Sequence, residues 1–265
     1  MPTTWITMHN PEPCTQADNR PVSQPVSTIT LKWASAADEV VNAAETRHQL
    51  QVMANQAKIP ELPDAMFHHG PGDKLKPSII WRPARGGVCL TAVGATARTT
   101  LFQALPNLMA ALVDITGEQI DMALPPGTHA GVTLVRRSPV YVARHVLIAK
   151  KPGQMQRWKG ASEDERRAIL HEMVERSLQL QAEAWDLWMP DRIPGLRLLN
   201  YAKDIGGADV TRSGGADRQT RIVGTRCPAI RFTCGLKLAG PWAIGHGTSK
   251  GFGCLREQIR MARAK

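Results

Sequence analysis

Alternation of apolar and polar residues along the first half of the chain predicts strands and amphipathic helices in turn. Residues 26–33 alternate and contain β-branched types, as a half-buried strand does. Ser35, followed three residues later by Asp38, forms a capping-box pattern, and apolar residues at three- and four-residue steps predict a helix up to Ala57. Two β-rich runs, a second helix and a closing strand follow, at residues 78–82, 87–92, 96–114 and 132–136. The order β-α-β-β-α-β is that of the ferredoxin-like unit.

The second half begins with another alternating run and then a long helix. Residues 140–149 alternate as a strand, and Ser162 with Glu165 forms a capping box before a helix to about Trp188. Strand-like alternation resumes at residues 230–238. The sequence predicts an α+β fold in three parts: an N-terminal extension of residues 1–25, a ferredoxin-like domain of residues 26–138 and a second domain of residues 139–265.

The composition is typical of a globular protein that stays in solution. Hydrophobic residues make up 43% and charged residues 21% of the 265, which argues against disorder, collagen and coiled coil. No apolar run approaches the roughly 18 residues of a membrane span, and residues 1–10 lack the pattern of a secretory signal. We expect a cytoplasmic protein with no membrane partner. The five cysteines form no CxxC, so reduced and mostly packed thiols are expected.

Positive charge is concentrated in the second half of the chain. The formal net charge is −2 over residues 1–130 and +12 over residues 131–265, where 17 of the 24 cations are arginines. The guanidinium group matches phosphate oxygens and stacks on bases, so a polyanion is the expected partner, and a basic surface without a dedicated ligand is the alternative. The candidate RNA-binding arginines are Arg157, Arg166, Arg167, Arg192, Arg197, Arg212, Arg218, Arg221, Arg226 and Arg231.

Two groups of these arginines have an alternative interpretation. Arg157, Arg166 and Arg167 lie near the start of the long helix, where cations oppose the helix dipole and are not placed for helix stability. They serve a ligand or lie there by chance. The Gly-, Asp- and Arg-rich connector of residues 190–231 is ordered by a polyanion or is a plain mobile loop.

A glycine-rich loop at residues 245–253 is the most specific motif of the chain. Glycine permits positive φ and lets backbone N–H groups approach an anion, so the loop is suited to phosphates or else packs tightly against another backbone. It matches neither the Walker spacing nor the dinucleotide fingerprint, so no nucleotide cofactor is expected. The candidate RNA-contacting residues of the loop are Gly245, Gly247, Ser249, Lys250, Gly251 and Phe252.

The loop resembles the glycine-rich loop of the RAMP superfamily of CRISPR-associated proteins. The pattern Gly-x-Gly, then residues including Lys, then Gly-Phe-Gly-Cys-Leu near the carboxyl terminus is most similar to that of the repeat-processing endoribonucleases. The long helix with basic flanks and the arginine-rich second half are most similar to the type IV version. The resemblance implies tandem ferredoxin-like domains, with the long helix inserted in the second.

The resemblance also implies an activity. Such an enzyme cleaves the precursor CRISPR transcript within each repeat, at the base of the repeat hairpin, without a metal ion. The ribose 2′-OH attacks its own phosphodiester, giving a 2′,3′-cyclic phosphate and a 5′-OH, and the product stays bound for assembly with other CRISPR effector subunits. This chemistry needs a proton acceptor, cations on the phosphorane and an in-line nucleophile.

Three residues are candidates for catalysis. Family members often place a histidine on the first helix, and His48 is the only histidine on the helix predicted here, about 80° from an apolar stripe centred on Val40. Arg47 lies inside that stripe, a local inconsistency typical of functional sites. His246 in the glycine loop is the second histidine candidate. His48 satisfied by a neighbour and an arginine-only site remain alternatives, and His68 and His69 lack further ligands for zinc.

Two other classes of function remain open. One is a non-catalytic RNA-binding subunit of the same superfamily, since the catalytic residue varies within the family. The other is an unrelated basic enzyme that modifies or hydrolyses nucleic acid.

Overall fold

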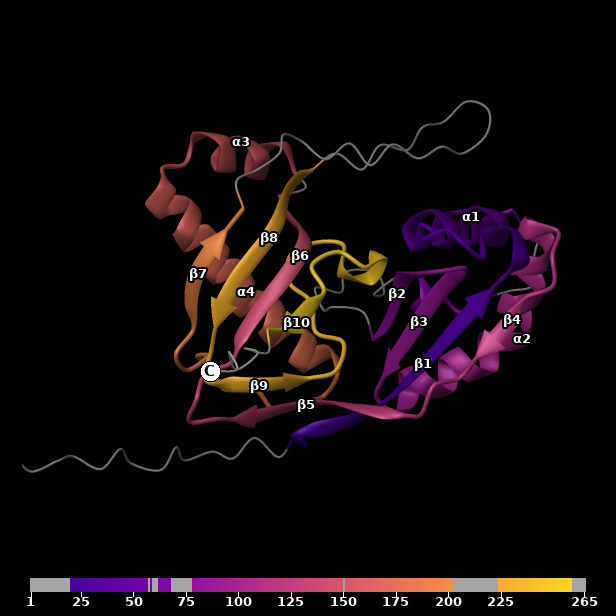
Figure 1. The fold of residues 1–265 in the computed structure, drawn as a ribbon, viewed down its shortest axis with the longest axis horizontal. Coiled ribbons are helices and arrows are strands. Elements are labelled where there is room, and N and C mark those ends of the chain that lie inside the picture. Colours follow the sequence, from indigo (N-terminus) through magenta and orange to yellow (C-terminus); the bar gives the residue numbers. More distant parts are fainter. Residues whose placement is uncertain are drawn as a thin grey trace, which may run out of the picture.

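The computed structural model describes residues 20–56, 58, 62–67, 78–149, 151–202 and 224–258, of which the side chain of Lys250 is not described. Within these ranges the chain forms four α-helices and two antiparallel sheets, so the predicted α+β class is confirmed. Figure 1 shows the second sheet in one half of the molecule and β1 to β4 in the other. The extension predicted at residues 1–25 lies mostly outside the described residues, and the chain is already in a strand at Ser23.

The first sheet has the strand order β2-β3-β1-β5-β9, and β4 pairs with β1 beside β5. Its strands are β1 Ser23–Lys32, β2 Ile79–Ala84, β3 Gly87–Val93, β4 Asp121–Ala123, β5 Thr128–Leu134 and β9 Leu236–Ala239. All four strands predicted in this half are confirmed within a few residues. Alternation identified them because one face of the sheet is buried: Ile29 and Leu31 of β1 are fully buried beneath the helices.

Two helices cover that face of the first sheet. Helix α1 spans Ala43–Asn55 and α2 spans Ala95–Thr116, and Leu50 and Leu101 enter the same core cluster as Trp81 of β2. The predicted second helix is therefore confirmed almost to the residue. The α1 prediction was wrong at its start, because the helix is capped by Asn42, seven residues after Ser35.

Two polar residues suit the N-cap position of the first helix, and the second of them, Asn42, caps α1. Asn42 accepts hydrogen bonds from the backbone N–H groups of Ala44 and Glu45 at 3.1 and 3.4 Å. Ser35 lies instead in a short 3-10 turn, where its N–H donates to Glu118 at 2.8 Å and its hydrogen bonds lower the pKa of that carboxyl. Ser35, the first residue of the predicted capping box, is therefore engaged by a residue distant in the sequence and does not cap α1.

The second sheet has the strand order β10-β6-β8-β7. Its strands are β6 Val140–Ala149, β7 Arg197–Tyr201, β8 Thr225–Thr233 and β10 Leu255–Glu257. Helix α3 Pro152–Gly160 and helix α4 Glu163–Ala184 lie between β6 and β7. The predicted capping box is confirmed, because Ser162 Oγ accepts from the N–H of Glu165 at 3.3 Å and the Glu165 carboxylate accepts from the N–H of Ser162 at 2.7 Å.

The last predicted strand is divided in two. Residues 230–238 turn at Gly235, where a Cβ would lie 3.0 Å from the carbonyl oxygen of Pro194, and continue as β9 in the other sheet. The first sheet therefore contains a strand from beyond residue 138, and Figure 1 shows β9 beside β5 below the second sheet. Between β8 and β10 the chain forms β9 and the glycine loop, in the place where a ferredoxin-like unit has its second helix.

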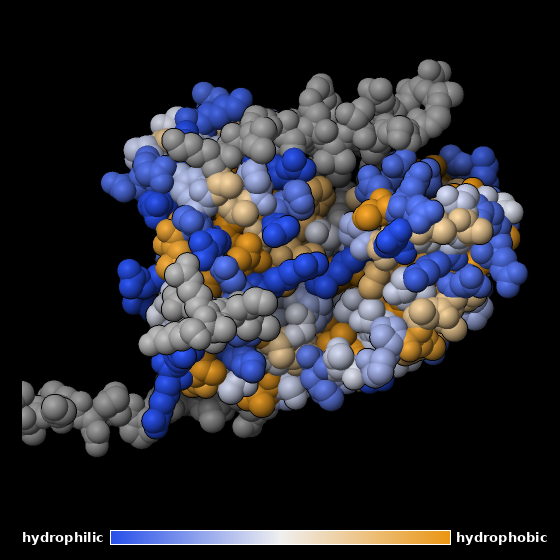
Figure 2. All heavy atoms as spheres, in the orientation of Figure 1, coloured by the Kyte–Doolittle hydropathy of each residue, from blue (hydrophilic) through white to orange (hydrophobic). Residues whose placement is uncertain are grey.

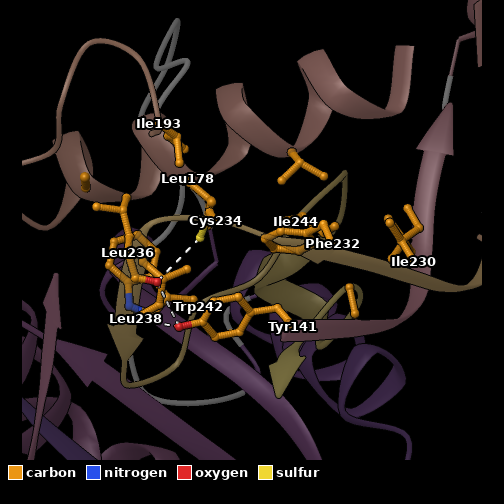
Figure 3. Packing of buried hydrophobic residues seen from close by; sticks show 14 of the residues in the cluster. Tyr141, Leu178, Ile193, Ile230, Phe232, Cys234, Leu236, Leu238, Trp242 and Ile244 are labelled. Carbon is orange, nitrogen blue, oxygen red and sulfur yellow. Dashed lines mark hydrogen bonds between the residues drawn. The ribbon is translucent and has the colours of Figure 1, made fainter. Parts of the chain in front are cut away.

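A buried tyrosine fastens β9 to the second sheet (Figure 3). The hydroxyl of Tyr141 donates to the carbonyl of Leu236 at 3.1 Å and accepts from the N–H of Leu238 at 2.8 Å. Burial raises the pKa of the Tyr141 phenol above its usual range, so the hydroxyl keeps its proton and can make both bonds. Phe232 and Trp242 complete this part of the core, in the cluster that also contains the residues of α4.

Replacing Tyr141 by Phe is expected to destabilise the protein by about 2 kcal/mol, because two buried backbone groups lose a hydrogen-bond partner. Urea denaturation measures this change. Tyr201→Phe is the matched control, since the Tyr201 hydroxyl bonds Glu163 at the surface, and it should cost less than about 0.5 kcal/mol. Equal losses for the two variants would contradict this assignment.

The thiols are packed as expected where the structure describes them. Cys227 and Cys234 are buried, Cys89 and Cys254 are half-buried, and none of these four described thiols forms a disulfide. Burial raises the pKa of Cys234 to about 11, so this thiol stays protonated at neutral pH. Among the described helices, none has both the length and the apolar character to cross a membrane.

Candidate nucleic-acid interface

The two faces of the second sheet differ sharply. Helix α4 covers one face, where Leu170 and Val174 pack with Tyr141 and Phe232. In Figure 1, α4 lies behind the sheet, so the other face points toward the viewer, and Figure 2 shows hydrophilic side chains over it. The strand register shows which side chains lie on this uncovered face, because directly opposite residues share a face.

Arginines flank β6 on the uncovered face. Val142 is paired with Arg256 of β10 on one side and with Arg231 of β8 on the other. One step along, Arg197 of β7 is paired with Thr233 of β8. The neighbouring residues of these strands, such as Phe232, point into the core, so alternation places these three arginines on the uncovered face.

A second row of residues paired across β6 lies further along this strand. His246 forms an isolated antiparallel bridge with Leu147, and Leu147 is paired with Arg226 on its other side. Arg144, which is paired with Ala229, is exposed on the same face. The row brings the loop histidine and an arginine to either side of one strand.

We call the set of Arg144, Arg197, Arg226, Arg231 and Arg256 the arginine face. The four described strands of this sheet contain a single carboxylate, Glu257, and its pairing with Tyr141 puts it on the covered side. Cations here are therefore not neutralised by acids of the same strands. A cationic surface without intervening carboxylates fits a phosphate backbone.

The glycine loop is fastened to the edge of this sheet by its backbone. The N–H of His246 donates to the carbonyl of Leu147 at 2.8 Å. The N–H of Gly253 donates to the carbonyl of Arg144 at 3.1 Å. On the α4 side, the N–H of Gly245 donates to Ser177 Oγ at 3.0 Å. The loop is thus placed between the sheet and α4.

The glycines are required by close approach to protein. At Gly253, with φ +67°, a Cβ would collide with the carbonyl oxygen of Ile244. At Gly251, with φ +85°, a Cβ would lie 2.9 Å from Cδ of Pro83 on β2, so the loop also touches the first sheet. Tight packing on backbone, the second interpretation of the motif, accounts for Gly253, and positive φ with the close Pro83 ring accounts for Gly251. His246, Ser249 and Phe252 stay half-exposed, so contact with phosphates remains a prediction.

Comparison with known proteins now fixes the family. The family described as "Type IV CRISPR-associated endonuclease Csf5" matches residues 12–259, which is most of the chain. This protein belongs to the Csf5 family. A search of the curated proteins finds no match.

Solved structures of Csf5 and Cas6b have the same fold as this Csf5-family chain. "Csf5, CRISPR-Cas type IV Cas6 crRNA endonuclease" is 16% identical, covers 89% of this chain and 100% of its own, and has a TM-score of 0.57. "Crystal structure of Cas6b" is 11% identical, covers 88% and 100%, and has a TM-score of 0.58. The expected resemblance to repeat-processing endoribonucleases of type IV is confirmed.

The two candidates on α1 of this Csf5-family protein have different surroundings. Arg47 is 6% exposed, with its guanidinium 5.8 Å from the ring centroid of Phe67, so it packs into the first core. His48 is half-buried. Val40 is 71% exposed and precedes the helix, so it was the wrong centre for the apolar stripe. Measured from Leu50, two residues away, His48 lies about 160° round the helix, on the side opposite the buried stripe.

The predicted arginines near α4 have structural partners. Arg166 donates to the carbonyls of Trp158 and Lys159, both at 3.1 Å, and so satisfies the open C-terminal end of α3. Arg166 therefore has a structural role at the end of α3, although its place near the start of α4 still opposes the dipole of that helix. Arg167 pairs with Glu163 at 3.2 Å, and Arg157 lines a hollow between α3 and α4.

The remaining candidate site residues lie in different parts of the chain. Arg197, Arg226 and Arg231 belong to the arginine face, whereas Arg192 is exposed in the segment after α4. Others lie outside the described residues, namely Arg212, Arg218, Arg221, His68, His69 and the side chain of Lys250. Across the described ranges, His, Cys, Asp and Glu side chains form no group of three that could hold a metal ion.

Sequence reasoning missed Arg144 and Arg256 of the arginine face. Strict alternation along residues 140–149 places Arg144 on the same side as Val142 and Val146, so the sequence contains no signal that it is exposed. Arg256 gave no such signal, because β10 has only three residues and its register is set by β6.

Proposed function

We propose that this Csf5-family protein cleaves precursor CRISPR RNA within the repeat, at the base of the repeat hairpin, by an attack of the ribose 2′-OH that needs no metal ion. The observation that carries the proposal is the arginine face, on which the described strands place no carboxylate and which borders the glycine loop that holds His246. Family membership supports the nuclease activity. Cytoplasmic location and binding to other CRISPR effector subunits stay predictions.

The chemistry requires three contributions from the protein. A base removes the 2′-OH proton while O2′ bonds to phosphorus, the P–O5′ bond breaks, and an acid protonates O5′. The products are a 2′,3′-cyclic phosphate and a 5′-OH. Guanidinium groups such as Arg226 would stabilise the extra charge of the phosphorane, and His246 would exchange protons, a contribution of about 10² to 10⁴-fold in rate.

Recognition would depend on charge and on hairpin shape. Double-stranded RNA is recognised mostly through its phosphates and its minor-groove surface, which suits a sheet face with five arginines. Phe252, half-exposed in the loop, would stack on an unpaired base beside the stem.

The experiment is cleavage of a synthetic RNA containing one repeat of the host CRISPR array, in excess EDTA. We expect two products, of which the upstream one ends in a 2′,3′-cyclic phosphate, identified by mass spectrometry. Cleavage only after addition of Mg²⁺, or an upstream product with a free 3′-OH, would overturn the mechanism.

A second candidate function is RNA binding without cleavage. It is favoured by the burial of Arg47 against Phe67, which removes one of the proposed catalytic groups from the surface. Tight binding of the same repeat RNA with no product after several hours would establish this alternative. The bound RNA would then be protected and not processed.

A further inference from the structure

Strand β6 changes the face that it presents to the core at one residue. Tyr141 and Ala143 point into the core under α4, and so do Val146 and Ile148. Each pair is two residues apart, as alternation requires, but the step from Ala143 to Val146 is three. The strand therefore reverses its faces between these positions.

The reversal is made at His145. This residue has φ +53°, one of two described non-glycine residues with positive φ, and both His145 and Arg144 before it are exposed. The opposite residue on β8 is Pro228, which has no N–H to give to the ladder, and the register resumes at the pair Val146 and Cys227.

A histidine in this conformation is sterically costly. The left-handed region costs a residue with a Cβ about 1–2 kcal/mol, and glycine would adopt it freely. His145 is exposed, so its imidazole does not recover this cost by filling the core. Strain of this kind, supported by the surrounding structure, is characteristic of functional sites.

His145 lies directly beside the glycine loop. The two backbone hydrogen bonds that fasten the loop to β6 end on the carbonyls of Arg144 and Leu147, one on each side of His145 along the strand. His246 is the bridge partner of Leu147, so it is a diagonal neighbour of His145, and such backbone positions are about 7–8 Å apart. Arg226, on the far side of Leu147, completes the surroundings.

We propose that His145 is a catalytic residue, which acts with His246 as an acid–base pair on one scissile phosphate at the junction of the arginine face and the glycine loop. One imidazole takes the 2′-OH proton as the O2′–P bond forms. The other, as imidazolium, gives its proton to O5′ as the P–O5′ bond breaks. This inference rests on the proposed function and adds a second proton-transfer group to it.

The test compares His145→Asn and His145→Gly with the natural protein in single-turnover cleavage of the repeat RNA. Asparagine tolerates positive φ and glycine adopts it without strain, so both variants should fold, which thermal unfolding verifies. We expect cleavage to slow by about 100-fold or more in each. The dissociation constant for RNA with a 2′-deoxy scissile nucleotide should change by less than about 3-fold, because chemistry and not binding is lost. Free imidazole should restore part of the rate of His145→Gly.

Asp186→Gly is the matched control, since Asp186 is the other described non-glycine residue at positive φ, at 50°, and lies after α4. It should cleave at the natural rate. A His145→Asn variant that cleaves at the natural rate would overturn the inference and leave the proposed function standing. Absence of product from the natural protein would overturn both.

Discussion

Replacing Arg226, Arg231 and Arg256 together by Gln is expected to weaken binding of repeat RNA about 50-fold at about 0.15 M salt. Each arginine that neutralises a phosphate releases counterions, and this contributes about 0.7 on a single strand and about 0.9 on a duplex to the slope of log affinity against log salt. Three arginines on one sheet face therefore contribute a slope of about 2 to 3. Fluorescence anisotropy titrations at several salt concentrations give both the affinity and the slope.

The matched control removes the same charge elsewhere. Arg85 directly follows β2, Arg98 lies on α2, and Arg176 is exposed on α4, which covers the other face of the second sheet. Replacing these three by Gln should leave the salt slope within about 0.5 of its natural value, because they are remote from the arginine face. Equal losses in the two triple variants would show that overall charge binds the RNA and would contradict a defined interface.

Gly253→Ala is expected to destabilise the protein by about 3 kcal/mol. The left-handed backbone at φ +67° costs an alanine about 1–2 kcal/mol, and its Cβ would collide with the backbone of Ile244, so the loop would have to move at a further cost of about 1–3 kcal/mol. The N–H of Ile244 also donates to the carbonyl of Gly253 at 2.9 Å, so this movement would disturb a backbone hydrogen bond.

Gly117→Ala separates the two costs. Gly117 ends α2 at φ +70°, and a Cβ there would meet nothing within 4 Å, so only the backbone cost of about 1 kcal/mol applies. Urea denaturation of both variants measures the difference. A Gly253→Ala protein as stable as Gly117→Ala would show that the loop does not pack as described.

The fold was predictable where the pattern is local. Strands such as β1 and β6 alternate because one face is buried, and alternation can be seen in any single sequence. The start of α1 was not predictable, since Ser35 and Asn42 both suit an N-cap and Ser35 is engaged by Glu118, a residue 83 positions away. The crossing of β9 to the first sheet likewise depends on the core around Tyr141.

The sequence predicted that the second half carries a cationic site, but it predicted only some of the residues of that site. The charge distribution identified the second half of the chain as the binding region, and the candidate arginines there included Arg197, Arg226 and Arg231. Placing these beside Arg144 and Arg256 requires the register of four strands, which no local pattern contains. His145, at positive φ, lies where β6 passes Pro228 of β8, and this juxtaposition comes from strand pairing that no local pattern contains.

The sharpest single measurement compares two repeat RNAs that differ in one atom, the 2′ oxygen of the scissile nucleotide, in single-turnover reactions containing EDTA. We predict cleavage of the ribose form and none of the 2′-deoxy form, with equal binding of both. Cleavage of the 2′-deoxy RNA at the rate of the ribose RNA would contradict this prediction, since the proposed nucleophile would then be absent from a reaction that still proceeds.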